Sequence, residues 1–102
     1  MMMLEWIPFQ EGDTLGGTGF DNGTILADEE FDNRCRITLE QTAGPHTITC
    51  DVYGEMFHTV FCREDQARKI YEAMKEKLTG YLSSSQTEAQ KREFYSEFFS
   101  QF

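Results

Sequence analysis

The residues most able to do chemistry lie in one stretch, HTITCDVYGEMFHTVFC, residues 46–62. Two His-x-x-x-Cys pairs follow one another here, His46 with Cys50 and His58 with Cys62. Imidazole and thiolate are ligands that zinc prefers, and they must converge within about 2.0–2.3 Å of the ion. Residues four apart on a strand point the same way but lie about 13 Å apart. Because the stretch alternates like two strands, we expect neither a metal site nor a cofactor.

Two predicted turns set the register of the strands around this stretch. A four-residue turn at 42–45 pairs Ile37 with Cys50, and a two-residue turn at 54–55 pairs Cys50 with Thr59. Since side chains alternate between the two faces of a sheet, the first His-x-x-x-Cys pair then faces the core. The second pair faces the opposite side, which also argues against one tetrahedral site.

The same register lines up Arg36, Asp51 and His58 across the second face of the sheet, with Arg34 and Tyr53 beside them. An acid that holds a histidine in one tautomer is a catalytic device. One interpretation is therefore a small enzyme with His58 as its base. The alternative is a solvated row of ion pairs. We favour the second because no nucleophile is predicted within reach of His58, and we predict no catalytic residue.

The elements that position these residues follow from hydrophobic periodicity. Alternation over 24–62 predicts a four-stranded antiparallel meander, and helical spacing predicts two helices after it. Residues 4–9 predict a short edge strand that ends near Pro8. The predicted fold class is α+β. The single domain of residues 1–102 divides into an N-terminal strand and glycine-rich loop at 1–23, the meander at 24–62, a core helix at 63–82 and an aromatic C-terminal helix at 86–102.

The glycine-rich segment QEGDTLGGTGFDNG, residues 10–23, raises the question of a phosphate site. A phosphate-binding loop needs a Lys-Ser/Thr pair and a helix directly after the glycines. Neither follows here. We therefore expect a flexible loop and assign it no role.

The C-terminal helix carries an aromatic stripe. Five aromatic side chains on one side of a helix will not stay exposed to water. Either the helix folds back over the second sheet face, or it grips another chain. We favour a C2 homodimer, because two-fold assemblies are the commonest for a self-complementary patch. The stripe consists of Phe94, Tyr95, Phe98, Phe99 and Phe102.

Charge narrows the choice of partners. The net charge is −9, with 18 acidic residues against 9 basic residues. Such a balance repels phosphate backbones and anionic lipids and suits a basic protein. The three cysteines do not form a disulfide framework, and no apolar run is long enough for a membrane span. We therefore expect a cytoplasmic location, no membrane and no nucleic acid.

Four strands followed by a helix resembles, in the order of elements alone, the dimeric single-stranded-DNA-binding coactivators and the whirly proteins. Those proteins use a basic, aromatic sheet surface, for which this chain offers Arg34, Arg36 and Tyr53 among acidic neighbours. Our leading hypothesis is a small acidic, non-enzymatic protein-interaction module that forms a homodimer. The alternatives are a nucleic-acid-binding dimer that uses the open sheet face, or a small enzyme that uses His58 and Asp51.

Overall fold

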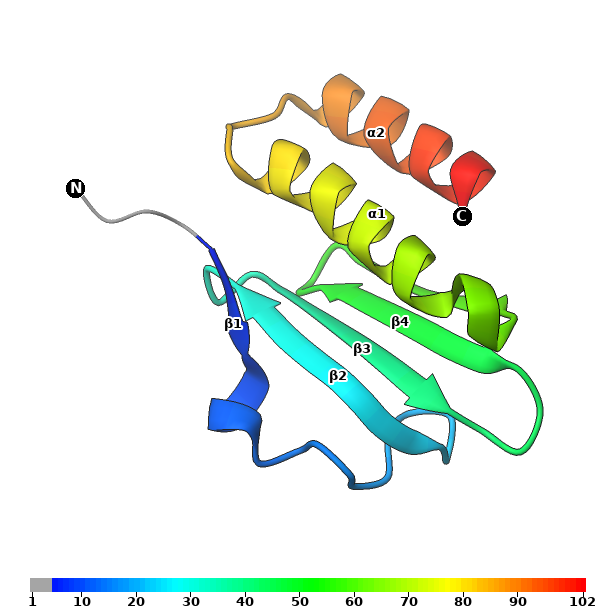
Figure 1. The fold of residues 1–102 in the computed structure, drawn as a ribbon. Coiled ribbons are helices and arrows are strands. Elements are labelled where there is room, and N and C mark those ends of the chain that lie inside the picture. The colour runs from blue at the N-terminus through cyan, green and yellow to red at the C-terminus, as the bar shows by residue number, and fades with distance from the viewer. Residues whose placement is uncertain (1–4) are drawn as a thin grey trace.

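The computed structural model describes residues 5–102 and shows an α+β fold, in which two C-terminal helices cover one face of an antiparallel sheet (Figure 1). The five strands lie in chain order across the sheet. The predicted meander and both helices are confirmed, as is the short first strand, whose predicted residue 4 lies outside the described residues. The strands are β1 Trp6–Pro8, β2 Thr24–Phe31, β3 Cys35–Gln41, β4 His46–Val52 and β5 Met56–Cys62; a 3-10 turn spans Phe9–Gly12, and the helices are α1 Glu64–Leu82 and α2 Glu88–Gln101.

Neither α1 nor α2 has the length and apolar character that crossing a bilayer would require, and this holds for all of residues 5–102.

The register between β3 and β4 matches the prediction. Ile37 pairs with Cys50 and Leu39 with Ile48, so the apolar sets of both strands share one face. The four-residue turn at 42–45 connects them, and Thr42 Oγ1 accepts a hydrogen bond from the Gly44 N–H at 3.1 Å. This short turn fixes the pairing because a one-residue slip would turn every apolar side chain of β4 to the wrong face.

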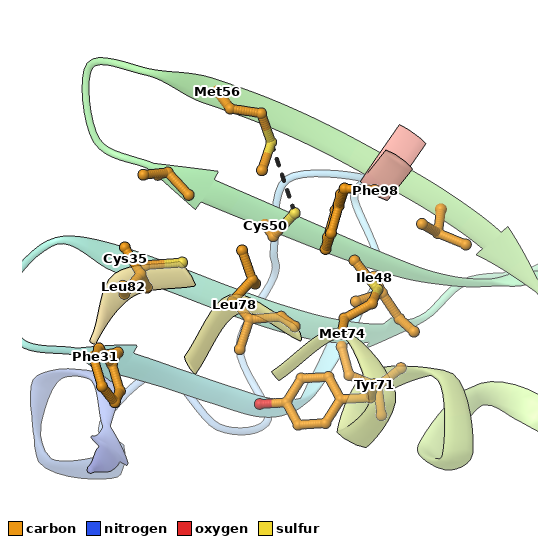
Figure 2. Close-up of a cluster of buried hydrophobic side chains, with 14 of the residues drawn as sticks. Phe31, Cys35, Ile48, Cys50, Met56, Tyr71, Met74, Leu78, Leu82 and Phe98 are labelled. Carbon is orange, nitrogen blue, oxygen red and sulfur yellow. Dashed lines mark hydrogen bonds between the residues drawn. The ribbon is translucent and has the colours of Figure 1, made fainter. Parts of the chain in front are cut away.

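Helix α1 covers this apolar face, as its helical periodicity predicts. The helix and the sheet interdigitate around side chains that are fully buried (Figure 2). Burying a large apolar side chain stabilises the fold by about 1.5–3 kcal/mol, so this layer supplies most of the driving force for folding. Its central members are Phe31, Ile37 and Ile48 from the sheet and Tyr71, Met74 and Leu78 from the helix.

Helix α2 begins at a reciprocal cap. Thr87 Oγ1 accepts from the Gln90 N–H at 3.1 Å, and Gln90 Oε1 accepts from the Thr87 N–H at 2.8 Å. The sequence offers a second capping box at Ser85 and Glu88, and the structure selects the one at Thr87. Two backbone donors that the helix leaves free are thereby satisfied.

The aromatic stripe packs α2 against its own domain. Phe98 is buried in the core beside Cys50 (Figure 2), and Phe94 stacks on Tyr81 with ring centroids 4.2 Å apart. Phe102 contacts Phe98 in turn. The helix therefore lies on the same side of the sheet as α1. The alternative in which it folds back over the second face is wrong.

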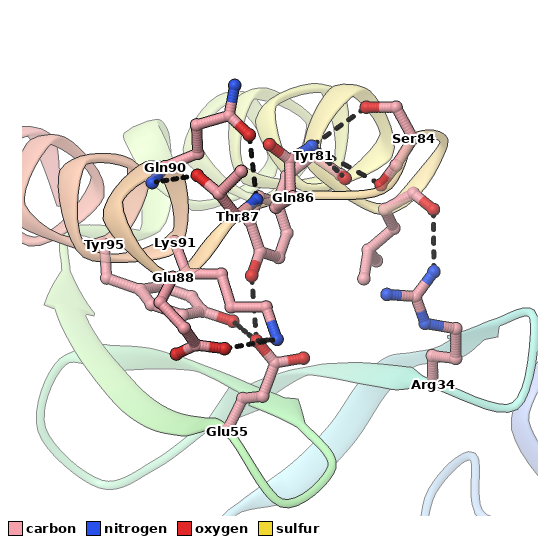
Figure 3. A network of polar contacts seen from close by, with 11 residues as sticks. Arg34, Glu55, Tyr81, Ser84, Gln86, Thr87, Glu88, Gln90, Lys91 and Tyr95 are labelled. Carbon is pink, nitrogen blue, oxygen red and sulfur yellow. Dashed lines mark hydrogen bonds and ion pairs between the residues drawn. The ribbon is translucent and has the colours of Figure 1, made fainter.

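Glu55 ties the start of β5 to both helices (Figure 3). Its Oε1 accepts from the hydroxyl of Tyr81 at 2.8 Å and from that of Tyr95 at 3.0 Å, and the ammonium of Lys91 lies 3.9 Å away. Burial raises the pKa of Tyr95, and its hydrogen bonds with Tyr81 and Glu55 add to this rise. Tyr95 therefore remains a neutral donor throughout the physiological pH range.

We predict that Phe98→Ala lowers the free energy of unfolding by about 3–5 kcal/mol, because it leaves a cavity under α2. Leu15→Ala is the control, a truncation away from α2 and from the core. Leu15 is 52% exposed, so its truncation should cost less than about 1 kcal/mol. Urea unfolding followed by circular dichroism measures both values. Equal losses for the two variants would show that the stripe does not insert as described.

Candidate functional site

The turn between β4 and β5 is one residue longer than predicted. Val52 pairs with Met56, so residues 53–55 form the connection, and the Glu55 N–H donates to the Val52 carbonyl at 2.8 Å. Gly54 takes a positive φ of 77°, which glycine adopts without strain. The predicted pairing of Cys50 with Thr59 is wrong, since Cys50 pairs with His58. Every side chain of β5 consequently lies on the face opposite to the one predicted.

His58 is therefore on the helix side of the sheet. Its ring lies 6.1 Å from that of Phe98 and 4.9 Å from that of Phe99, measured between centroids. Asp51, on the second face, pairs with Arg36 and Phe57 instead. The predicted row of Arg36, Asp51 and His58 does not form, and no acid in the described part of the chain hydrogen-bonds to His58.

All four histidine and cysteine side chains of the opening stretch share the helix side, so their predicted division between two faces is also wrong. They form two cross-strand pairs, His46 with Cys62 and Cys50 with His58. The Cys62 thiol donates weakly to the His46 carbonyl at 3.7 Å. Nowhere in residues 5–102 do three His, Cys, Asp or Glu side chains converge as metal ligands would.

On the second face, Arg36 is held by Asp28. Its Nε and Nη2 donate to the two carboxylate oxygens at 2.9 and 2.6 Å, and Thr38 and Thr14 donate to the same carboxylate. This hydrogen bonding with Asp28 raises the pKa of the guanidinium. The guanidinium carbon also lies 3.8 Å from the centre of the Phe9 ring. Arg36 is thus already paired and stacked.

The glycine-rich segment covers part of this face and is not a free loop. The fully buried carboxylate of Glu40 accepts from the backbone N–H of Asp21 at 3.0 Å and from that of Gly23 at 3.1 Å. A Cβ at Gly19 would lie 2.4 Å from the Glu40 carboxyl carbon, so any other residue there would displace the hydrogen-bonded carboxylate. Thr49 completes the contact by donating to the Asp21 carboxylate at 3.3 Å. The sheet face is therefore less open than the sequence suggests.

A pocket of about 350 Å³ remains between this segment and the sheet, lined in part by Thr14, Phe20 and Arg36. Its basic side chain, Arg36, is already neutralised by Asp28, and the other charged residue of the lining is Asp13. Arg36 is therefore not a free cation for an anionic ligand.

The other predicted polar residues also have intramolecular partners. Arg34 Nη1 donates to the Leu82 carbonyl at 2.8 Å, at the C-terminal end of α1, where a cation is favoured (Figure 3). The Tyr53 hydroxyl donates to the Glu30 carboxylate at 2.6 Å. Burial, and to a smaller extent this hydrogen bond, raises the pKa of Tyr53. The structure therefore divides the predicted polar site into separate pairs.

The surface that sequence reasoning missed is the outer edge of β5. The Tyr53 N–H donates to the carbonyl of Arg34, the residue before β3. At this end of β4, the backbone N–H and C=O groups of odd-numbered residues therefore point toward β3, and those of even-numbered residues point toward β5. By the same alternation, the N–H and C=O groups of Phe57, Thr59 and Phe61 point away from the sheet. No other strand within residues 5–102 pairs with them.

This edge is apolar and uncharged. The side chain of Phe57 is 57% exposed and that of Phe61 is 67% exposed, and both lie on the second face. The sequence of β5, MFHTVFC, contains no Lys, Arg, Asp, Glu or Pro. Natural sheets usually protect an edge with such residues. Their absence from the last strand of the meander is the signal that could have identified this surface.

Comparison with known proteins adds no functional information: no family model, curated protein or solved structure matches the chain.

We predict that Gly19→Ala lowers the free energy of unfolding by about 1–3 kcal/mol, because the new methyl group collides with the anchored carboxylate of Glu40. Gly80→Ala is the control, since Gly80 lies in α1 with open space around it. That change should stabilise the protein by about 0.5–1 kcal/mol. Thermal and urea unfolding report both. A Gly19→Ala protein as stable as the wild type would show that the segment does not rest on Glu40.

We also predict that the thiols of Cys35 and Cys50 react with a disulfide reagent only after unfolding. Both are buried, and burial raises the pKa of Cys50 to about 12, so roughly one part in ten thousand is thiolate at pH 8. Cys62 is partly exposed and should react first. The measurement is thiol release with and without denaturant, and equal rates for all three thiols in the native protein would contradict the prediction.

Proposed function

We propose that this chain is a non-enzymatic protein-interaction module that works as a homodimer, and that the outer edge of β5 is its contact surface. The observation that carries the proposal is an exposed strand edge without a charged residue or proline, flanked by Phe57 and Phe61. An edge of this kind is a template for pairing with another strand.

The aromatic stripe on α2 contributes less to association between chains than its composition suggests. Phe98 is buried in its own domain, and Phe94, Tyr95 and Phe102 pack against the same core. Phe99 remains exposed beside His58 of β5. We therefore assign to association only the exposed end of the stripe, next to the β5 edge.

The two alternative functions have less support. A nucleic-acid platform needs free cations, whereas Arg36 is paired with Asp28 and Arg34 donates to a helix C-terminus. An enzyme based on His58 would lack the acid that orients its base, because Asp51 lies on the other face. A basic protein remains the second partner that the charge of −9 favours. It would have to bind away from β5, which carries no acidic side chain.

The test is the solution mass measured by light scattering. The wild type should have twice the 11.8 kDa mass of the chain, and Phe61→Lys should be monomeric because it places a charge at the pairing edge. Leu15→Lys is the matched control. Leu15 is 52% exposed in the glycine-rich segment, so the same change in charge there should leave the dimer intact.

Salt supplies a second readout of the same proposal. Two chains that each carry −9 repel one another, and salt screens this repulsion while leaving apolar contacts in place. The dimer should therefore tighten between about 20 and 300 mM salt. A wild-type protein that is still monomeric at about 100 µM chain in about 300 mM salt would refute the proposed function.

A further inference from the structure

We infer that two copies of the chain join by antiparallel pairing of their β5 strands, with Thr59 of one copy opposite Thr59 of the other. This inference rests on the proposed homodimer and specifies its geometry. The two five-stranded sheets would then form one continuous ten-stranded sheet across a two-fold axis.

The outward-pointing residues of β5 are symmetric about Thr59. They read Phe57, Thr59, Phe61, the same from either end of the strand. A two-fold interface must present the same patch on both partners. In an antiparallel pair centred on Thr59, Phe57 lies opposite Phe61 of the second copy. Each of the three hydrogen-bonded pairs exchanges two bonds, or about six in all.

Neighbouring registers are less favourable for reasons visible in the sequence. If one strand is shifted by two residues so that Phe57 lies opposite Thr59 of the second copy, Phe61 lies opposite Glu55 of the second copy. A shift the other way places Phe57 opposite Arg63. Each shift brings an aromatic ring against a charged residue and loses part of the strand overlap. Only the register centred on Thr59 pairs all three outward-pointing residues with one another, and it places Glu55 opposite Arg63 of the second copy and not opposite a ring.

The chemistry around the edge favours a second copy over a basic protein. No acidic side chain of β5 offers a basic strand an ion pair. Aromatic rings flank the edge on both faces. Phe20 packs against Phe57 with ring centroids 5.7 Å apart on the second face, and Phe99 lies 4.9 Å from the ring of His58 on the helix side. These rings add apolar area to the contact, which the strand alone would leave small.

Cross-linking tests the register. Thr59→Cys is made in a Cys62→Ser background, while the buried Cys35 and Cys50 remain. In a hydrogen-bonded antiparallel pair the opposing Cα atoms are about 5.5 Å apart, within the range that a disulfide spans. Mild oxidation should convert this variant rapidly into a covalent dimer. Thr24→Cys in the same background is the control, an exposed strand threonine on β2, and should cross-link at least about tenfold more slowly.

A second pair of variants tests the backbone bonds without a thiol. The Thr59 N–H points away from β4, so Thr59→Pro removes both bonds of the central pair, one from each copy, while leaving the β4–β5 ladder intact. We expect the dissociation constant to rise at least tenfold for Thr59→Pro. Thr59→Val keeps the N–H and should change it little. Both variants should show the circular dichroism spectrum of the wild type.

Two results would overturn the inference in distinguishable ways. A dimer by mass whose Thr59→Cys form cross-links no faster than its Thr24→Cys form would refute the Thr59 pairing and leave the homodimer standing. A monomer at about 100 µM would refute the homodimer, and the pairing with it.

Discussion

The three-residue turn between β4 and β5 is the constraint on which the rest of the structure depends. Side chains alternate along a strand, so the number of residues in the turn decides the face of every residue that follows. The Glu55 N–H bonds to the Val52 carbonyl, and Gly54 supplies the positive φ. Met56 and Val60 consequently enter the core, and Phe57 is left outside.

The same turn places Glu55 where the two helices can use it. Its carboxylate takes hydrogen bonds from Tyr81 on α1 and from Tyr95 on α2. The register of β5 also brings His58 beneath the end of α2, against Phe98 and Phe99. The docking of α2, the loss of the predicted row of Arg36, Asp51 and His58, and the exposure of Phe57 and Phe61 therefore share one local cause.

The sequence predicts the parts of the fold that rest on strong local signals. The β3–β4 register is right because clear alternation and a short turn at 42–45 agree. The β5 register is wrong because its two faces differ little in hydrophobicity: Met56 and Val60 lie on one and Phe57 and Phe61 on the other. A prediction that buries the larger phenylalanine rings therefore chooses a turn that is one residue too short.

The cover on the second face is not predictable from hydrophobicity, because it is polar. Glu40 is fully buried, no cation among residues 5–102 pairs with it, and backbone N–H groups of the glycine-rich segment satisfy its carboxylate. A buried charge is tolerated only with such hydrogen bonds. Composition shows that the segment is rich in glycine. It does not show that Gly19 lies against the Glu40 carboxylate, or that Gly23 lies against the backbone carbonyl of Gln41.

The two edges of the sheet are treated differently, and the difference argues for a closed assembly. The first edge is β1, which is only three residues long and ends at Pro8, and beyond it the edge of β2 is occupied by backbone bonds between Ile25 and residues 16–17. Within residues 5–102, the edge of β5 has neither a pairing segment nor a guarding charge. An apolar edge left open invites pairing with any extended chain. The proposed two-fold pairing would occupy each β5 edge once and leave neither free, and the acidic remainder of the surface would keep such an assembly soluble.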